Sequence, residues 1–343
     1  MLTRRQMLAA SLAAGLVATT RAMGQAPNGQ QAPTPVTVAL DWTPNTNHIG
    51  LFVAKTLGLY AQAGLDVQIL PYGDTAAGTL VANGVANFGI LGSIGLFTQR
   101  TAGADLVATY ALVQTETGRL VVNADRTDLQ RPKDLDGRTY GGFGSDWENA
   151  LIGTIIRHDG GKGTFETVTL GTSAYEALAN GAVDFTLEVS TWEGVKAELD
   201  HVAQRTFRYA DFGVPDQHTS FIGSSGAWLD ANPETAAAFL KATRDGYGFA
   251  IAHPDEATDM LIAPNSDVLT DRALIRASLQ ALIDGHYLQT TDGVIGNIDG
   301  AKMAAMGNFL FAAGILKDVD GNAVTQRPDF SAYYRNAYLE SAK

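Results

Sequence analysis

The sequence contains no cysteine among its 343 residues. Disulfides, thiolate metal sites, cysteine nucleophiles and lipid attachment at an N-terminal cysteine are therefore excluded. Basic residues are also few, with 24 Lys and Arg against 36 Asp and Glu, and they form no long run. A net charge of −12 argues against nucleic acid and anionic membranes as partners.

The common catalytic signatures are missing as well. No serine has glycine at both −2 and +2, and GGFG (141–144) lacks both the third glycine of a dinucleotide fingerprint and the lysine of a P-loop. The six histidines show no metal-ligand spacing, and Ala323 takes the glycine position of a calcium loop in DVDGNA (318–323). We therefore expect no catalytic residue, no cofactor and no metal.

The N-terminus has the pattern of an export signal. The pair Arg4-Arg5 precedes an apolar run over residues 7–20, which is shorter than the ~20 residues that span a bilayer, and small residues follow at 22–26. We expect a twin-arginine-like signal peptide over residues 1–26 and a linker over 27–35. The alternative is an uncleaved membrane anchor.

From residue 36 onwards, short apolar segments alternate with segments of helical periodicity. The pattern predicts parallel βαβ units and hence an α/β fold. The strands are expected at 36–40, 65–70, 88–91, 106–113, 120–123, 139–142, 167–170 and 183–188, and the helices between them at 47–63, 75–83, 93–100, 147–158 and 174–180. Three further helices are expected at 233–252, 278–288 and 301–313, the first beginning at Pro233 after the capping residue Asn232.

This order predicts two lobes. We place crossover strands near residues 119–126 and 218–225, which assigns residues 36–121 plus 224–343 to lobe I and 122–223 to lobe II.

The loop DWTPNTNH (41–48) follows the first expected strand and precedes the first helix. In open α/β sheets, ligands bind just beyond the carboxyl ends of the strands. The Trp42 indole can stack on a heteroaromatic ring, the amide of Asn45 and the imidazole of His48 can bond its edge, and Pro44 stiffens the loop. A capped helix start with Trp42 in the core is the equal alternative.

At this loop the chain resembles the thiamine-pyrimidine-precursor family of periplasmic binding proteins. The resemblance extends from residue 36 to about 261 and is based on DWTPNTNH (41–48), GLFVAK (50–55), WEG (192–194), FRYADFGVPD (207–216), NPE (232–234) and HP (253–254). The later motifs are shared with the wider group of sulfonate and nitrate binders.

The resemblance implies a type II periplasmic binding protein, with two α/β lobes joined by two hinge strands. It implies a monomer without stable membrane insertion that binds an aminopyrimidine and delivers it to an ABC transporter permease. The implied ligand-binding residues are Trp42, Asn45, His48, Ser93, Gly142, Phe143, Gly144, Glu188, Ser190 and Trp192. Backbone N–H groups at Gly142 and Gly144 would approach the ligand closely. Trp147 serves either the ligand or lobe packing.

Two departures from the family matter. Where many members carry glutamate two residues before the tryptophan of WEG, this chain has Ser190, with Glu188 two residues earlier and on the same face of an extended strand. Three interpretations follow: Glu188 accepts from the ligand's amino group from a shifted position, the ligand differs from that of the family, or Glu188 is a solvated strand end.

The second departure concerns the fungal pyrimidine synthase of the same fold, which consumes its own histidine and a lysine-bound pyridoxal phosphate. Leu91 and Gly95 take the places of that lysine and histidine, so the Schiff base cannot form. The leading hypothesis is an exported, non-enzymatic binder of an aminopyrimidine thiamine precursor. A binder of riboflavin or a sulfonate and, in another class, a pyrimidine-synthase-like enzyme are the alternatives.

Overall fold

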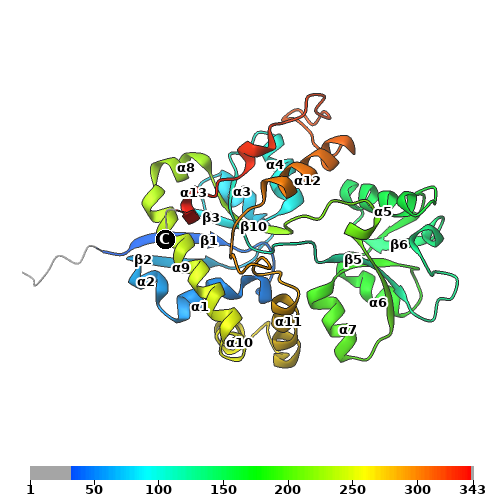
Figure 1. Ribbon diagram of the computed structural model, residues 1–343, viewed down its shortest axis with the longest axis horizontal. Coiled ribbons are helices and arrows are strands. Elements are labelled where there is room, and N and C mark those ends of the chain that lie inside the picture. The colour runs from blue at the N-terminus through cyan, green and yellow to red at the C-terminus, as the bar shows by residue number, and fades with distance from the viewer. Residues whose placement is uncertain (1–31, 341–343) are drawn as a thin grey trace, which may run out of the picture. The chain divides into compact units, whose positions relative to one another are not determined.

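The computed structural model describes residues 32–340, so the expected signal peptide lies outside the described residues. A five-stranded sheet with the strand order β2-β1-β3-β10-β4 combines four strands from the first 111 residues with β10 from further along the chain (Figure 1). β1 runs parallel to β2 and β3, whereas β10 is antiparallel to both of its neighbours, β3 and β4. The strands are β1 (Thr34–Ala39), β2 (Leu65–Leu70), β3 (Phe88–Gly92), β4 (Val107–Ala111) and β10 (Ser220–Ser224).

Helices cover both faces of this sheet (Figure 1). One apolar core lies between the sheet and α1 (Ile49–Thr56), α2 (Leu59–Gln62), α9 (Pro233–Ala252), α10 (Pro254–Ile262) and α11 (Arg272–Asp284). A second core lies between the other face and α3 (Ala77–Ala82), α4 (Ser93–Thr101) and α12 (Gly300–Ala312). The short α8 (Gly226–Ala231) and α13 (Ala337–Glu340) complete this first lobe.

Two glycines let α1 and α9 cross closely. A Cβ at Gly50 would overlap the ring of Tyr247, and one at Gly246 would overlap the carbonyl oxygen of Gly50. The helix expected over residues 47–63 is divided into a 3-10 turn, α1 and α2, because Gly58 between α1 and α2 adopts the left-handed conformation with φ +69°. Pro233 begins α9 as predicted.

The second lobe is built on two smaller sheets. β8 (Thr186–Val189), β5 (Gly118–Asn123) and β9 (Gln204–Arg208) form an antiparallel sheet in the order β8-β5-β9, and β6 (Thr139–Gly142) pairs in parallel with β7 (Glu166–Thr169). The helices are α5 (Asp146–His158), α6 (Ala174–Ala179) and α7 (Val195–Leu199). The expectation of parallel pairing is wrong for β5, which is antiparallel to both β8 and β9, and for β10, which is antiparallel to β3 and β4. β5 carries the chain into the second lobe and β9 carries it back, so these two strands run in opposite directions.

Short helical turns connect these elements. They are η1 (Thr46–His48), η2 (Pro132–Leu135), η3 (Gly171–Ser173), the π-helical η4 (Ser190–Gly194), η5 (Tyr209–Phe212), η6 (Ala263–Asn265) and η7 (Phe330–Tyr333). Within residues 32–340, no helix combines the length and the apolar character needed to cross a membrane.

The chain changes lobes between β4 and β5 and again between β9 and β10. The boundaries placed after residues 121 and 223 therefore fall inside β5 and β10, and Thr34 and Pro35 of the expected linker already pair with β2. We place the change of lobe in residues 112–117 and 215–219, hereafter the crossing segments.

Lys302 of α12 holds both crossing segments. Its Nζ contacts Asp216 Oδ2 at 2.6 Å and donates to the carbonyl oxygen of Gln114 at 2.7 Å. The other oxygen of Asp216 accepts from the hydroxyl of Thr115 and from the backbone N–H of Glu116, so one carboxylate links the two segments to each other. Both crossing segments are thus anchored to the first lobe.

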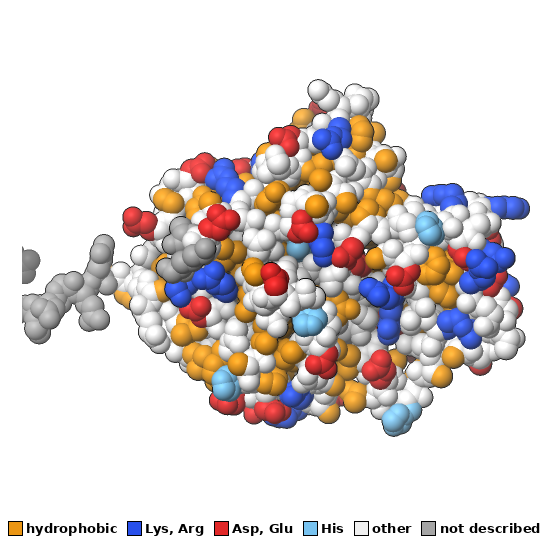
Figure 2. All heavy atoms as spheres, in the orientation of Figure 1, with side chains coloured by type: hydrophobic (Ala, Val, Ile, Leu, Met, Phe, Trp, Pro, Cys, Tyr) orange, Lys and Arg blue, Asp and Glu red, His pale blue; other side chains and the backbone are white. Residues whose placement is uncertain are grey.

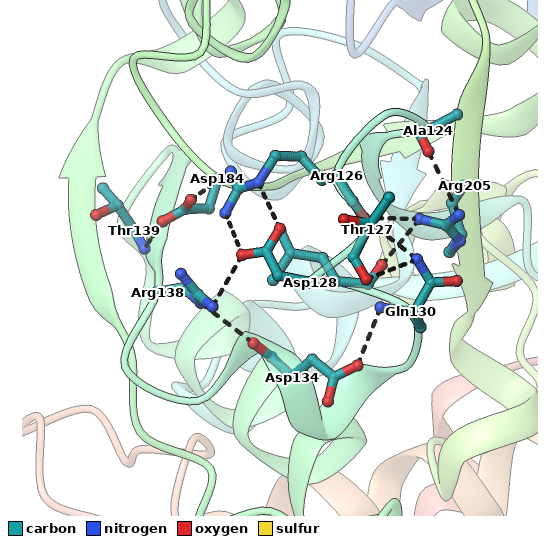
Figure 3. Close-up of polar contacts among 11 residues, drawn as sticks. Ala124, Arg126, Thr127, Asp128, Gln130, Asp134, Arg138, Thr139, Asp184 and Arg205 are labelled. Carbon is teal, nitrogen blue, oxygen red and sulfur yellow. Dashed lines mark hydrogen bonds and ion pairs between the residues drawn. The ribbon is translucent and has the colours of Figure 1, made fainter.

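A network of ion pairs fixes the outer loop of the second lobe (Figure 3). The Arg126 guanidinium bonds to Asp128 at 2.9 Å and to Asp184 at 2.7 Å, while Arg138 reaches Asp128 at 3.0 Å. Arg205 of β9 donates to backbone carbonyls of the same loop, including that of Leu129. The hydrogen bonds from Arg126 lower the pKa of Asp128 to about 2. On the face drawn in Figure 2, basic and acidic side chains lie interspersed over both lobes.

Candidate functional site

The loop over residues 41–48 leaves the carboxyl end of β1 and is braced by its own side chains. Asn45 caps η1, accepting from the N–H of Asn47 at 2.9 Å and donating to the carbonyl of Thr43 at 3.0 Å. His48 is buried, with Nε2 2.8 Å from Asp41 Oδ1 and Nδ1 accepting from the N–H of Asn45. Because a backbone N–H can only donate, Nδ1 carries no proton and Nε2–H donates to Asp41.

Asn45 and His48 therefore stabilise the conformation of the loop. They do so with the amide and the imidazole, the same groups that were predicted to bind the ligand. The loop is also tied to α11, because the hydroxyls of Thr46 and Ser278 lie 2.7 Å apart in the interior. Such bracing reduces the conformational entropy that the loop would lose when it binds a ligand.

Trp42 projects from this braced loop and is 43% exposed. The interpretation of Trp42 as a core residue is therefore wrong. Its indole lies beside the ring of Tyr72, which is 41% exposed, with centroids 5.1 Å apart and planes inclined at 43°. Two aromatic rings thus stand half open to solvent at the carboxyl edge of the sheet, where open α/β sheets bind ligands.

Sequence reasoning missed Tyr72, although a signal was present. β1 and β2 are parallel and in register, with Ala39 opposite Leu70, so the loops that follow the two strands leave the same edge side by side. The predicted strand over 65–70 ends directly before Pro71-Tyr72, and an aromatic residue there could have been paired with Trp42. A hollow of about 330 Å³ lies next to these loops, lined in part by Leu40, Pro44, Ile69 and Pro71.

Ser93 opens α4 at the carboxyl end of β3 and is buried. Its N–H bonds to the carbonyl oxygen of Thr219 at 2.9 Å, which places it against the second crossing segment. Three buried polar atoms near this point have no hydrogen-bond partner in the described structure, Oε1 of Gln217, Nδ1 of His218 and Oγ of Ser220. Sequence reasoning identified none of them, because a single glutamine, histidine or serine after a loop carries no distinctive pattern.

In the GGFGS segment, the N–H groups of Phe143 and Ser145 are bonded within the protein, next to the Gly142 and Gly144 N–H groups expected to face a ligand. The carboxylate of Glu148 is buried and accepts from the N–H groups of Phe143 at 3.0 Å and Ser145 at 2.8 Å. It also accepts from the hydroxyl of Tyr140 at 2.8 Å. The helix start that could have received an anion is therefore occupied by the protein's own carboxylate.

Two of the three glycines of this segment, Gly142 and Gly144, are required by local packing and by the backbone conformation. A Cβ at Gly142 would overlap the hydroxyl of Tyr140, and Gly144 has φ +74°. The Phe143 side chain, by contrast, is 53% exposed.

Glu188 is not a solvated strand end. It is buried on β8 and pairs with Arg119 of β5, whose Nε lies 2.5 Å from Oε1. Burial raises the pKa of Glu188, and Arg119 opposes that rise. The carboxylate thus has a fixed partner inside the protein, one residue pair away from the strand end.

Ser190 and Trp192 belong to η4 and not to the strand. β8 ends at Val189, so the alternation that was expected to place residues 188 and 190 on one face stops there. The N–H of Ser190 bonds to the carbonyl of Thr117, and Trp192 is half-buried against the core that α1, α9 and α11 share. η4 also contacts α11, the helix to which the loop over residues 41–48 is bonded.

Trp147 serves lobe packing. Its ring lies edge-on to Phe309 of α12, with centroids 6.0 Å apart and an interplanar angle of 79°.

The predicted site residues lie in both lobes. Trp42, Asn45 and His48 lie in the one loop that follows β1. Ser93 lies at the neighbouring strand end, and residues 142–144 and 188–192 lie in the second lobe.

The architecture is that of the periplasmic binding proteins. The periplasmic aliphatic sulphonate binding protein SsuA of Escherichia coli matches it with a TM-score of 0.66 at 17% sequence identity. The match covers 88% of this chain and 92% of the other. The predicted fold class, a type II periplasmic binding protein of two α/β lobes, is confirmed, although the two segments that join the lobes, residues 112–117 and 215–219, are irregular and not strands.

The chain belongs to the NMT1/THI5-like family, which matches residues 45–257. It is 28% identical over 234 residues to the formylaminopyrimidine-binding protein of Halalkalibacterium halodurans, covering 66% of this chain and 69% of that protein. The riboflavin-binding protein RibY of Chloroflexus aurantiacus is 26% identical over 301 residues, which are 85% and 84% of the two chains. The resemblance found in the motifs is confirmed.

Enzymes are among the relatives too. A 4-amino-5-hydroxymethyl-2-methylpyrimidine phosphate synthase of Saccharomyces cerevisiae is 24% identical over 237 residues, covering 65% of this chain and 68% of the enzyme.

Proposed function

We propose that this protein is an exported solute-binding protein that captures an aminopyrimidine thiamine precursor and delivers it to the permease of an ABC importer. The observation that carries the proposal is Trp42, a half-exposed indole on a braced loop at the carboxyl edge of a largely parallel sheet. A ring held in this way can stack on a flat heterocycle at little entropic cost. Export would use the twin-arginine-like segment of residues 1–26.

The relatives favour a flat heteroaromatic ligand. The formylaminopyrimidine-binding protein and the riboflavin-binding protein both carry a heterocycle in their names. A flavin is the second candidate, because the riboflavin-binding relative aligns over 301 residues against 234 for the pyrimidine binder. Both ligands would use the same stacking surface.

A sulfonate is disfavoured by the electrostatics of the second lobe. Glu148 occupies the helix start that would otherwise receive the anion, and Arg119 is paired with Glu188. An additional anion at either place would meet a carboxylate.

The buried position of Leu91 argues against a pyrimidine-forming reaction. Its side chain packs in the core between the sheet, α3 and α4, at the place that the resemblance to the synthase implies for that enzyme's lysine. Without an amine there, pyridoxal phosphate has no Schiff-base partner at that position.

Titration calorimetry of the purified protein tests the proposal. The ligands are 4-amino-5-hydroxymethyl-2-methylpyrimidine, its formylamino analogue, riboflavin and an alkanesulfonate. We expect binding of the aminopyrimidines, and we expect Trp42→Ala to weaken it roughly 5- to 150-fold, the equivalent of ~1–3 kcal/mol of base stacking. Trp42→Phe should retain most of the affinity.

Trp228→Phe is the matched control. Trp228 lies on α8 and packs against Phe88 of β3. The substitution should leave the affinity unchanged. Because Trp42 is half exposed, its alanine variant should melt near the wild-type temperature. Aminopyrimidine binding that is indifferent to Trp42→Ala would contradict the stacking role, and riboflavin binding alone would favour the second candidate.

A further inference from the structure

The aromatic pair at the carboxyl edge has two members, and the proposed function uses only one of them. Tyr72 follows β2 directly after Pro71, and Trp42 follows β1 after two intervening residues. The parallel register that sets Ala39 opposite Leu70 delivers both residues to the same edge. Their proximity is therefore built into the sheet.

The ring geometry indicates what Tyr72 does for Trp42. Centroids 5.1 Å apart and planes inclined at 43° lie within the range of attractive aromatic pairs. Exposures of 43% for Trp42 and 41% for Tyr72 mean that each ring is covered on part of its surface and open on the rest. The tyrosine thus restricts the rotation of the indole while a large part of the indole stays accessible.

We propose, on the basis of the proposed function, that Tyr72 is a positioning residue of the ligand site, holding the Trp42 indole so that a flat heteroaromatic ring stacks on its open surface. The phenol hydroxyl is not needed for this role, because the contact is made by the ring. The loop beneath Trp42 is fixed by His48 and Asn45, so the side-chain torsions of Trp42 are the freedom that remains for Tyr72 to restrict.

The proposal predicts coupling between the two residues. Tyr72→Phe keeps the ring and should bind 4-amino-5-hydroxymethyl-2-methylpyrimidine as the wild type does. Tyr72→Leu keeps apolar bulk but loses the ring, and its affinity should fall roughly 2- to 12-fold, which is what loss of one aromatic pair is worth. In a Trp42→Ala background, Tyr72→Leu should cause no further loss.

A readout without ligand tests the ring contact itself. The chain has four tryptophans, so protein labelled with 5-fluorotryptophan should give four fluorine resonances, that of Trp42 being assigned by Trp42→Phe. Tyr72→Leu should move the Trp42 resonance through the lost ring current and leave that of Trp228 in place. An unmoved Trp42 resonance would overturn the proposal.

The affinities separate this proposal from the proposed function. If the wild type binds no aminopyrimidine, the proposed function fails and takes the positioning role with it. If the wild type binds and Tyr72→Leu binds equally well, only the role of Tyr72 is refuted. Equal losses from Tyr72→Leu with and without Trp42 would also refute it, because Tyr72 would then act independently of the indole.

Discussion

Acidification should destabilise the fold through one buried histidine, His218. It lies on the second crossing segment, is almost fully buried, and accepts at Nε2 from the backbone N–H of Asp299 at 2.9 Å. Since that N–H can only donate, Nε2 is unprotonated in the folded protein and the imidazole is neutral. Protonation of Nε2 would place its N–H directly against the backbone N–H of Asp299.

The environment of the ring agrees with this assignment. Burial is the main cause that lowers the pKa of His218 to about 4, and the nearby Lys302 lowers it further. Asp299 and Asp216 act in the opposite direction but do not compensate for the burial. An unfolded histidine has a pKa near 6.5.

The sign of the effect follows from proton binding. Between pH 6.5 and pH 4, the unfolded chain binds a proton at this position that the folded chain does not, so stability falls as the pH falls through this window. The free energy of unfolding falls by about 3 kcal/mol over the whole window, and by about 2 kcal/mol once pH 5 is reached.

Urea unfolding at pH 7 and pH 5, followed by circular dichroism, measures this loss. In His218→Gln the amide oxygen can still accept from Asp299, but no proton is taken up, so the decrease between the two pH values should be smaller by about 2 kcal/mol. His253→Gln is the matched control, since His253 is exposed, and it should keep the wild-type decrease. Equal decreases in the wild type and His218→Gln would refute the reasoning.

Two further predictions concern stability. Glu148→Gln should lower the free energy of unfolding by about 2–3 kcal/mol, because an amide cannot accept from Phe143, Ser145 and Tyr140 together and loses charge-assisted hydrogen bonds. An unchanged melting temperature in scanning calorimetry would contradict it, and the exposed Glu176→Gln is the control. Ser220→Ala should stabilise the protein by up to ~1–3 kcal/mol, since it removes a buried hydroxyl without a partner. A lower melting temperature would show that the hydroxyl is satisfied, for example by a bound water.

Local patterns in the sequence were sufficient for the fold class and for the loop that carries the proposal. The alternation of strands and helices follows from periodicity, and it predicted β1, β2, β3 and most of α5 within a few residues. DWTPNTNH identified the loop, because caps and turns depend on residues within four positions of one another.

The same local signals could not decide what each polar side chain contacts. Asn45 and His48 were assigned to the ligand, yet they brace their own loop. Glu148 fills the helix start expected to face a ligand, and Glu188 meets Arg119, which is 69 positions away in the chain.

Only the tertiary structure decided these partners, as well as the pairing of Trp42 with Tyr72 and the reversal of direction at β5. The partners of Asn45, His48 and Glu148 are local, but several alternatives lay within reach of each side chain. The pairs Trp42–Tyr72 and Glu188–Arg119 depend on sheet register and on which strands become neighbours. Periodicity reports which face of an element is apolar, but it carries no information about which distant element will cover that face.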